Sequence, residues 1–105
     1  MTGVAFTVRK AYFDEIVAGR KTREVRRASP YWRAIWTRVA RALERGEPVE
    51  ATFLCGPRWH RRRVVDAILY PDATVALGRE PSEQGRKDLG DGAVIGFDLG
   101  EAVPP

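Results

Sequence analysis

The chain has 105 residues, of which 18 are Lys or Arg and 14 are Asp or Glu, so its formal net charge is +4. This length predicts one domain spanning residues 1–105 and is too short for a large two-domain catalytic cleft. The single cysteine and single histidine exclude a disulfide framework, a Cys-rich zinc site and a histidine triad around a metal. We therefore expect no cofactor and no metal.

The charge is unevenly distributed along the chain. Residues 1–63 carry 15 basic and 6 acidic side chains, whereas residues 64–105 carry 3 basic and 8 acidic ones. Arg accounts for 15 of the 18 basic residues. A GC-rich genome also favours Arg, but such a bias does not explain why the charge is concentrated in the first part. The asymmetry predicts a polyanionic partner.

Nothing in the sequence predicts a membrane segment or an export signal. There is no run of about 18 apolar residues, and the N-terminus lacks the basic stretch and apolar core of a signal peptide. We therefore expect a soluble, cytoplasmic protein with no membrane partner.

The first elements alternate between strand and helix. Residues 4–8 have the alternation of a half-buried strand, and apolar residues four apart predict a short helix over residues 11–18. Gly19 follows, where a left-handed residue would end that helix. An extended pattern over residues 22–27 makes residues 19–21 a tight corner between helix and strand.

A longer amphipathic helix is predicted over residues 30–45, with Gly46 and Pro48 ending it. Ser29 is a favourable N-cap residue and Pro30 is well suited to the first helical position. Five apolar residues recur along one face, namely Trp32, Ile35, Trp36, Val39 and Leu43. We expect Trp36 in the core, whereas Trp32 lies near the helix start and could overhang a cleft.

The second half of the chain contains mostly strands. Residues 50–55 and 59–70 are predicted strands joined by a Gly-Pro turn, and residues 93–99 are a closing strand. Residues 71–92 are predicted to be a loop with at most one helical turn. A small parallel sheet is an alternative, but the tight turn requires an antiparallel pair. The predicted fold class is α+β: a small, mostly antiparallel barrel of about five strands with two or more helices packed on it.

The densest polar site lies at the predicted corner and the strand that follows it. Alternation along a strand places Thr22, Glu24 and Arg26 on one face, and Lys21 at the corner can lean over the rim. A lysine, a carboxylate and an arginine in proximity alter one another's charge states, as functional sites often require. A solvated strand whose charges pair across the sheet is the alternative.

The residues Gly19-x-Lys21-x-x-Glu24-x-Arg26 match the Gly-x-Lys-x-x-Glu-x-Arg signature of the ASCH domain family (activating signal cointegrator homology). The preceding helix also matches that family, and the sequence resembles a small stand-alone prokaryotic or phage member. The resemblance implies a PUA-like β-barrel in which Lys21, Glu24 and Arg26 face a cleft for RNA or a modified nucleobase or nucleotide.

Some small members of that family resemble acetylcytidine amidohydrolases, which use a lysine, a threonine on the signature strand and a distant glutamate. This sequence matches the lysine with Lys21 but has Glu24 in place of the threonine. Thr22 resembles another family position, and the distant acid would be Glu80 or Glu83. Other members resemble ribonucleases, so the resemblance also implies hydrolysis of RNA as an alternative.

A second basic element spans residues 58–63. Arginines interleaved with an aromatic residue suit a single-stranded nucleic acid, because Trp59 can stack on a base while Arg61 and Arg63, on one face, contact phosphates. The alternative is a charged edge strand that resists aggregation. Tyr70 ends this strand and is expected either to close a pocket or to cap the core. His60 and Cys55 are more typical of a surface histidine and a buried thiol than of catalytic groups.

These observations leave three hypotheses open. The first is a module that binds RNA or a modified base. The second is a small hydrolase acting on a modified nucleoside or on RNA, in which Lys21 activates a nucleophile or water and Glu24 transfers the proton. The third is an interaction domain that contacts another protein through the helix at residues 30–45.

Overall fold

The computed structural model describes residues 1–104, which form five strands and four helices. The strands are β1 (Thr2–Thr7), β2 (Arg23–Arg27), β3 (Val49–Cys55), β4 (Arg58–Tyr70) and β5 (Val94–Ala102). The helices are α1 (Lys10–Val17), α2 (Pro30–Glu44), α3 (Ala73–Leu77) and α4 (Glu83–Leu89). The predicted strands and helices all occur, but the segment predicted to be a loop, residues 71–92, contains α3 and α4. No helix in the described residues has the length and apolar character needed to cross a bilayer.

Local sequence signals determine where α2 begins and where both α1 and α2 end. The hydroxyl of Ser29 accepts a hydrogen bond from the backbone N–H of Trp32 at 3.2 Å, and Pro30 occupies the first turn of α2. Gly19 and Gly46 follow α1 and α2 with φ of +79° and +71°. Glycine adopts this left-handed conformation without the steric cost that other residues have, so both helices end where the sequence predicts.

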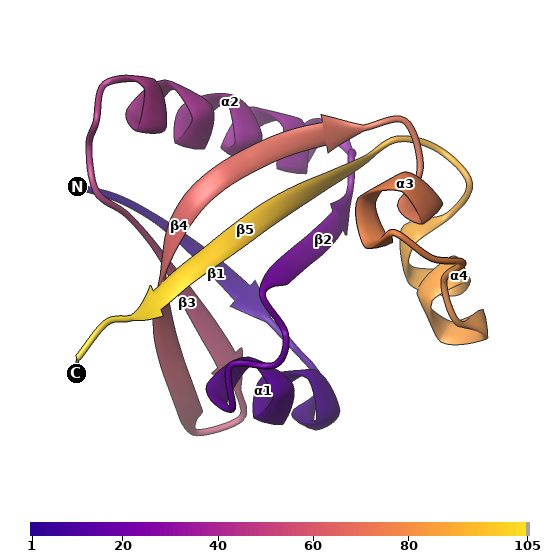
Figure 1. Ribbon diagram of the computed structural model, residues 1–105, viewed down its shortest axis with the longest axis horizontal. Helices are drawn as coiled ribbons and strands as arrows, with labels where there is room; N and C mark the ends of the chain where they lie inside the picture. Colours follow the sequence, from indigo (N-terminus) through magenta and orange to yellow (C-terminus); the bar gives the residue numbers. More distant parts are fainter. Residues whose placement is uncertain (105) are drawn as a thin grey trace.

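The five strands form one mixed sheet in the order β1-β3-β4-β5-β2. Strands β1 and β3 are parallel, and the other three pairs are antiparallel. The parallel pair is possible because the chain passes through α1, β2 and α2 between the two strands. The predicted α+β class, with a mostly antiparallel sheet of five strands and helices packed on it, is confirmed (Figure 1).

The sheet curls into a half-barrel rather than closing into a complete one. The register between β4 and β5 shifts on either side of Val64, and such irregularities bend a strand, as the long curve of β4 shows (Figure 1). Strands β1 and β2 remain edge strands. A side chain joins them: the guanidinium of Arg26 on β2 donates a hydrogen bond to the carbonyl of Thr7 at the end of β1, at 3.1 Å.

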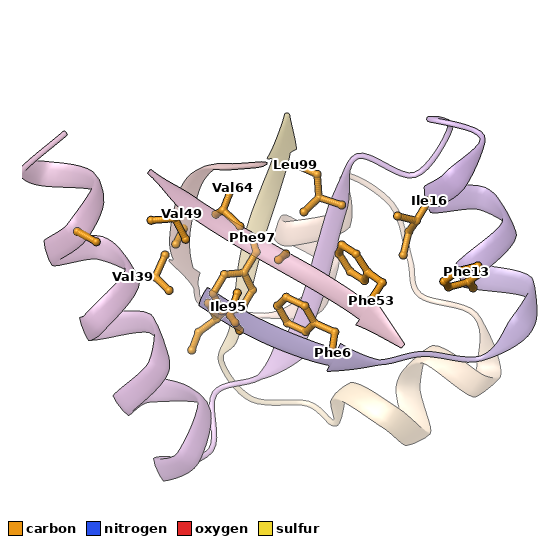
Figure 2. Packing of buried hydrophobic residues seen from close by; sticks show 14 residues of the cluster. Phe6, Phe13, Ile16, Val39, Val49, Phe53, Val64, Ile95, Phe97 and Leu99 are labelled. Carbon is orange, nitrogen blue, oxygen red and sulfur yellow. The ribbon is translucent and has the colours of Figure 1, made fainter. Parts of the chain in front are cut away.

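The main core lies inside the curl of the sheet, with α1 and α2 at opposite ends of it (Figure 2). The α2 helix contributes Val39, and α1 contributes Phe13 and Ile16. Phe6 stacks on Phe53, with 5.3 Å between ring centroids. Since the apolar face of α2 packs against this core, a protein partner as in the third hypothesis would have to contact the exposed, polar face of this helix.

A second, smaller cluster explains why residues 71–92 are not simply a loop. Its buried members come from β2, α3, α4 and β5, namely Val25, Ala73, Ala76, Leu89 and Val94. Each of these helices has only seven residues or fewer, too short for a clear apolar periodicity. Their ends nevertheless carry capping residues, because Asp72 and Ser82 accept hydrogen bonds from the backbone N–H groups of Val75 and Gly85.

A candidate nucleobase cleft on the edge strand β2

A cleft of about 1140 Å³ runs along β2, with α1 on one side and the α3–α4 segment on the other. This volume exceeds the roughly 300–1000 Å³ of ordinary small-molecule pockets. Seven Lys or Arg side chains and four Asp or Glu side chains line it, so its walls carry a positive balance. Four of the residues singled out from the sequence line this cleft, namely Lys21, Thr22, Glu24 and Arg26.

Glu24 is the buried ionisable group at the base of this cleft. Only 4% of the residue is exposed, and its Oε1 accepts hydrogen bonds from Lys21 Nζ at 3.1 Å and from the backbone N–H of Val25 at 3.2 Å. Its other oxygen, Oε2, is buried and has no hydrogen-bond partner in the part of the chain that the structure describes. Burying a carboxylate oxygen without a hydrogen-bond donor costs free energy, unless a ligand supplies an N–H or O–H group to it.

The two basic residues of the signature lie on either side of this carboxylate, and both rest on aromatic rings. Lys21 Nζ is 4.5 Å from the centre of the Tyr12 ring. The Arg26 guanidinium has a nitrogen 3.7 Å from Glu24 Oε2 and lies over the rings of Phe6 and Trp32, at 5.1 and 5.3 Å. Cation–π contacts of this kind hold long side chains in place. Trp32 itself lines the cleft, in keeping with its expected position at the helix start.

An ion pair connects the two sides of the cleft. Arg9 at the start of α1 donates hydrogen bonds to both carboxylate oxygens of Asp88 on α4, at 2.7 and 3.2 Å. These hydrogen bonds hold the pKa of Asp88 below its ordinary value. On the rim, a hydrogen bond from Arg20 likewise lowers the pKa of Glu15. The rim thus consists of solvent-exposed ion pairs, whereas the Glu24 carboxylate is enclosed.

Sequence analysis missed a second ion pair in the cleft. Arg23 on β2 contacts Asp98 on β5 at 2.5 Å and also donates to the carbonyl of Ala76. The two residues face each other across the β2–β5 pair, which only the register of the sheet reveals. Apart from the basic character of residues 20–27, nothing in the sequence predicts that Arg23 and Asp98 are neighbours.

Four other residues predicted to bind a ligand do not line the cleft, namely Trp59, Arg61, Arg63 and Tyr70. The first three lie on β4, two strands from β2 in the sheet. Tyr70 packs against the smaller hydrophobic cluster, with the Arg23 guanidinium 5.3 Å from its ring centre. Of the two roles considered for Tyr70, the structure therefore favours capping of the core.

The two candidates for a distant catalytic acid are also missing from the cleft lining. Glu80 pairs with Arg86, and Glu83 lies 3.9 Å from Lys87 on the same helix. Both carboxylates are largely exposed, and neither lines the cleft. The geometry therefore brings no second glutamate from this segment to Lys21.

Two residues of the basic run point to the interior side of the sheet. Arg62 donates hydrogen bonds to the carbonyl of Ile16, in the last turn of α1, and to that of Gly100. His60 has a buried Nε2 with no partner among residues 1–104. Desolvation lowers the pKa of His60 below its ordinary value of 6.5, and the charge of Arg62 lowers it further. Both residues support the fold rather than the cleft.

The partly buried His60 predicts a loss of stability in mild acid. Because the folded state depresses the pKa of His60, the unfolded chain takes up its proton first. The stabilisation is present above about pH 6.5, the unfolded value, and is lost as the pH falls towards the folded pKa. Urea unfolding curves on either side of this range should show a smaller free energy of unfolding on the acid side. The variant His60→Gln should show a flatter pH dependence, and parallel curves for the two proteins would contradict the prediction.

The chain thus folds as a curled half-barrel, with helices at its ends and a cleft along the edge strand β2 (Figure 1). No protein-family model and no curated protein sequence matches the chain. Among solved structures, the fold is similar to that of ZmASCH from Zymomonas mobilis, crystallised as a serine-to-alanine variant. The two chains are 18% identical, the TM-score is 0.67, and the match covers 98% of this chain and 70% of that chain. The chain thus has the fold of an ASCH-domain protein, and the resemblance noted in the signature is confirmed at the level of the fold.

Proposed function

We propose that this protein binds a nucleobase of a single-stranded RNA in the cleft along β2. The observation that carries the proposal is the buried carboxylate of Glu24, whose Oε2 lacks a donor within residues 1–104. The exocyclic amino and ring N–H groups of a base are donors of the kind that this oxygen lacks. Single-stranded RNA is recognised through such unstacked bases, which proteins hydrogen-bond on their edges and stack on aromatic or Arg side chains.

The surroundings of Glu24 supply the other two requirements of a base site. Trp32 and Tyr12 line the cleft, and the Arg26 guanidinium over Trp32 offers a plane on which a base can stack. The excess of basic over acidic side chains on its walls favours phosphate, and Arg27 and Arg79 extend this charge along the cleft. We also propose that residues 1–105 form one domain of a cytoplasmic protein, as the composition predicts.

A hydrolase acting on a modified nucleoside or on RNA is the second candidate. It is favoured by the 3.1 Å distance between Lys21 Nζ and Glu24 Oε1, which is short enough for direct proton transfer. In this reading, Lys21 activates a nucleophile or water and Glu24 carries the proton to the leaving group. We favour the binding function over the hydrolase, because neither Glu80 nor Glu83 lies in the cleft with Lys21 and Glu24.

The test is fluorescence anisotropy of a labelled single-stranded RNA titrated with wild type and with Lys21→Ala over a salt series. We expect affinity to fall steeply with salt, because phosphate contacts release counterions, and Lys21→Ala to weaken binding about tenfold or more. Lys10→Ala is the matched control, since Lys10 is an exposed lysine on α1 that pairs with Asp14 outside the cleft.

Two further measurements distinguish a loss of binding from unfolding and from hydrolysis of the ligand. Because Lys21 is the nearest cation to a buried carboxylate, Lys21→Gln is tested alongside Lys21→Ala, and circular dichroism checks that both variants are folded. Chromatography of the RNA and of acetylated nucleosides after incubation tests the hydrolase: turnover that disappears in Lys21→Ala would favour it. Absence of RNA binding at low salt would exclude the binding function.

A further inference from the structure

One face of the sheet is open to solvent in the structure of residues 1–104. On the outer side of β1, β3 and β4, three rows of directly paired residues lie next to one another, and we call them the open face. The rows are Thr7-Leu54-Trp59, Ala5-Thr52-Arg61 and Gly3-Glu50-Arg63. The residues between them along each strand point into the core, as the burial of Val4, Phe6 and Phe53 shows.

The β4 side of this face has an exposed aromatic ring beside cations. Trp59 is 48% exposed, and the guanidinium of Arg61 lies 4.9 Å from its ring centre. Arg61 donates a hydrogen bond to the hydroxyl of Thr52 and has no carboxylate partner in the described part of the chain. Arg63 lies 3.9 Å from Glu50, which is a weak ion pair. The charge of Arg61 is therefore available to an anion.

The β1 side of the face carries small residues and reaches the cleft. Gly3 and Ala5 are exposed and have little or no side chain, so nothing bulky stands above the sheet there. Thr7 belongs to both surfaces: it begins the row that ends at Trp59, and it lines the cleft. Two strand spacings separate Thr7 from Trp59, a distance of about 10 Å. A path over Leu54 thus connects the cleft with the aromatic ring.

We propose that the open face is a second subsite for the same single-stranded nucleic acid, holding the nucleotides next to the base in the cleft. This inference rests on the proposed function. In it, Trp59 stacks on a base, Leu54 supports the strand between the two sites, and Arg61 pairs with a phosphate. A stacking aromatic residue beside an arginine without a carboxylate partner is typical of proteins that bind a single strand with little sequence preference. A protein partner would bury the Arg61 charge unfavourably unless it supplied a carboxylate to pair with it.

The experiment compares ligands of increasing length. Binding of a mononucleotide, a trinucleotide and an octanucleotide is measured by calorimetry at low salt for wild type, Trp59→Ala and Arg61→Gln. We expect both variants to bind the mononucleotide as wild type does. Trp59→Ala should weaken octanucleotide binding roughly fivefold to a hundredfold. Arg61→Gln should also reduce the salt dependence by about one phosphate contact. The matched controls are Val75→Ala on α3 and Arg41→Gln on α2, which are exposed residues away from both surfaces.

The outcomes separate this inference from the function on which it rests. If Trp59→Ala and Arg61→Gln bind the octanucleotide as tightly as wild type while Lys21→Ala weakens it, the second subsite is wrong and the cleft function stands. If wild type binds no RNA of any length, the proposed function fails and the subsite fails with it. If sedimentation shows a dimer that Trp59→Ala dissociates, with RNA binding unchanged, the open face is an interface between copies and the inference is overturned.

Discussion

Replacing Glu24 by glutamine is expected to weaken RNA binding about tenfold to a hundredfold without lowering the stability of the folded protein. In the free protein the buried Oε2 has no donor within residues 1–104, so the carboxylate costs free energy that a ligand recovers. Glutamine has the same shape but no charge, so the variant loses the strong hydrogen bonds to the base. Functional sites often retain such locally unfavourable groups. Anisotropy titrations and thermal unfolding of the same samples measure the two effects.

Glu15→Gln is the matched control for this experiment. Glu15 also lines the cleft, but it is an exposed rim residue paired with Arg20, so its neutralisation should change binding little. The contrary result is equally clear: a Glu24→Gln variant that binds RNA normally but unfolds at a much lower temperature would show that the carboxylate supports the fold. In that case Glu24 would stabilise the corner between α1 and β2 rather than bind a base.

Replacing Phe6 by alanine is expected to lower the free energy of unfolding by about 3–5 kcal/mol, the largest stability effect of any substitution discussed here. Phe6 is fully buried and contacts three aromatic rings, with centroid distances of 5.2 Å to Trp32, 5.3 Å to Phe53 and 5.2 Å to Phe97. Such a loss is a large part of the roughly 5–15 kcal/mol that stabilises an ordinary domain. Urea and thermal unfolding measure it, and Tm should fall by at least about 12 °C.

Two variants test whether this effect arises from the aromatic core. Val75→Ala removes an exposed apolar side chain and should change stability by less than about 0.5 kcal/mol. Phe6→Leu retains much of the volume but loses the ring beneath Arg26, so it should be less destabilising than Phe6→Ala while still weakening RNA binding. A Phe6→Ala variant with wild-type stability would contradict the prediction, because it would show that the aromatic contacts of Phe6 do not stabilise the half-barrel.

Local patterns in the sequence predicted most of the fold. The Ser29-Pro30 start and the five-residue apolar stripe sufficed for α2, and glycine after each of the first two helices predicted their ends. These features depend on neighbouring residues alone, so they can be recognised without a structure. The two short helices after Tyr70 were missed because their stability comes from packing Ala73, Ala76 and Leu89 against β2 and β5.

The candidate site was predicted only in part, for the same physical reason. Lys21, Glu24 and Arg26 lie within six residues, so strand alternation and the family signature placed them together. Two of their partners come from a distant part of the chain: Thr7 accepts the Arg26 hydrogen bond, and Phe6 lies beneath the same guanidinium. No local pattern could predict that β2 would be an edge strand or that Glu24 Oε2 would be enclosed without a donor.

By itself the sequence determined the strands, the helices α1 and α2, the antiparallel β3–β4 pair, the position of the polar signature and the alternation of residues 58–63. Only the tertiary structure decided that this basic run serves two surfaces. Arg62 lies on the inner side and is bonded to α1, whereas Trp59 and Arg61 lie on the open face, away from the cleft. The reason is that alternation assigns residues to the two faces of a strand but does not say which face becomes the core. That choice depends on how the sheet curls and on which helices cover it, and both are set by contacts between residues far apart in the chain.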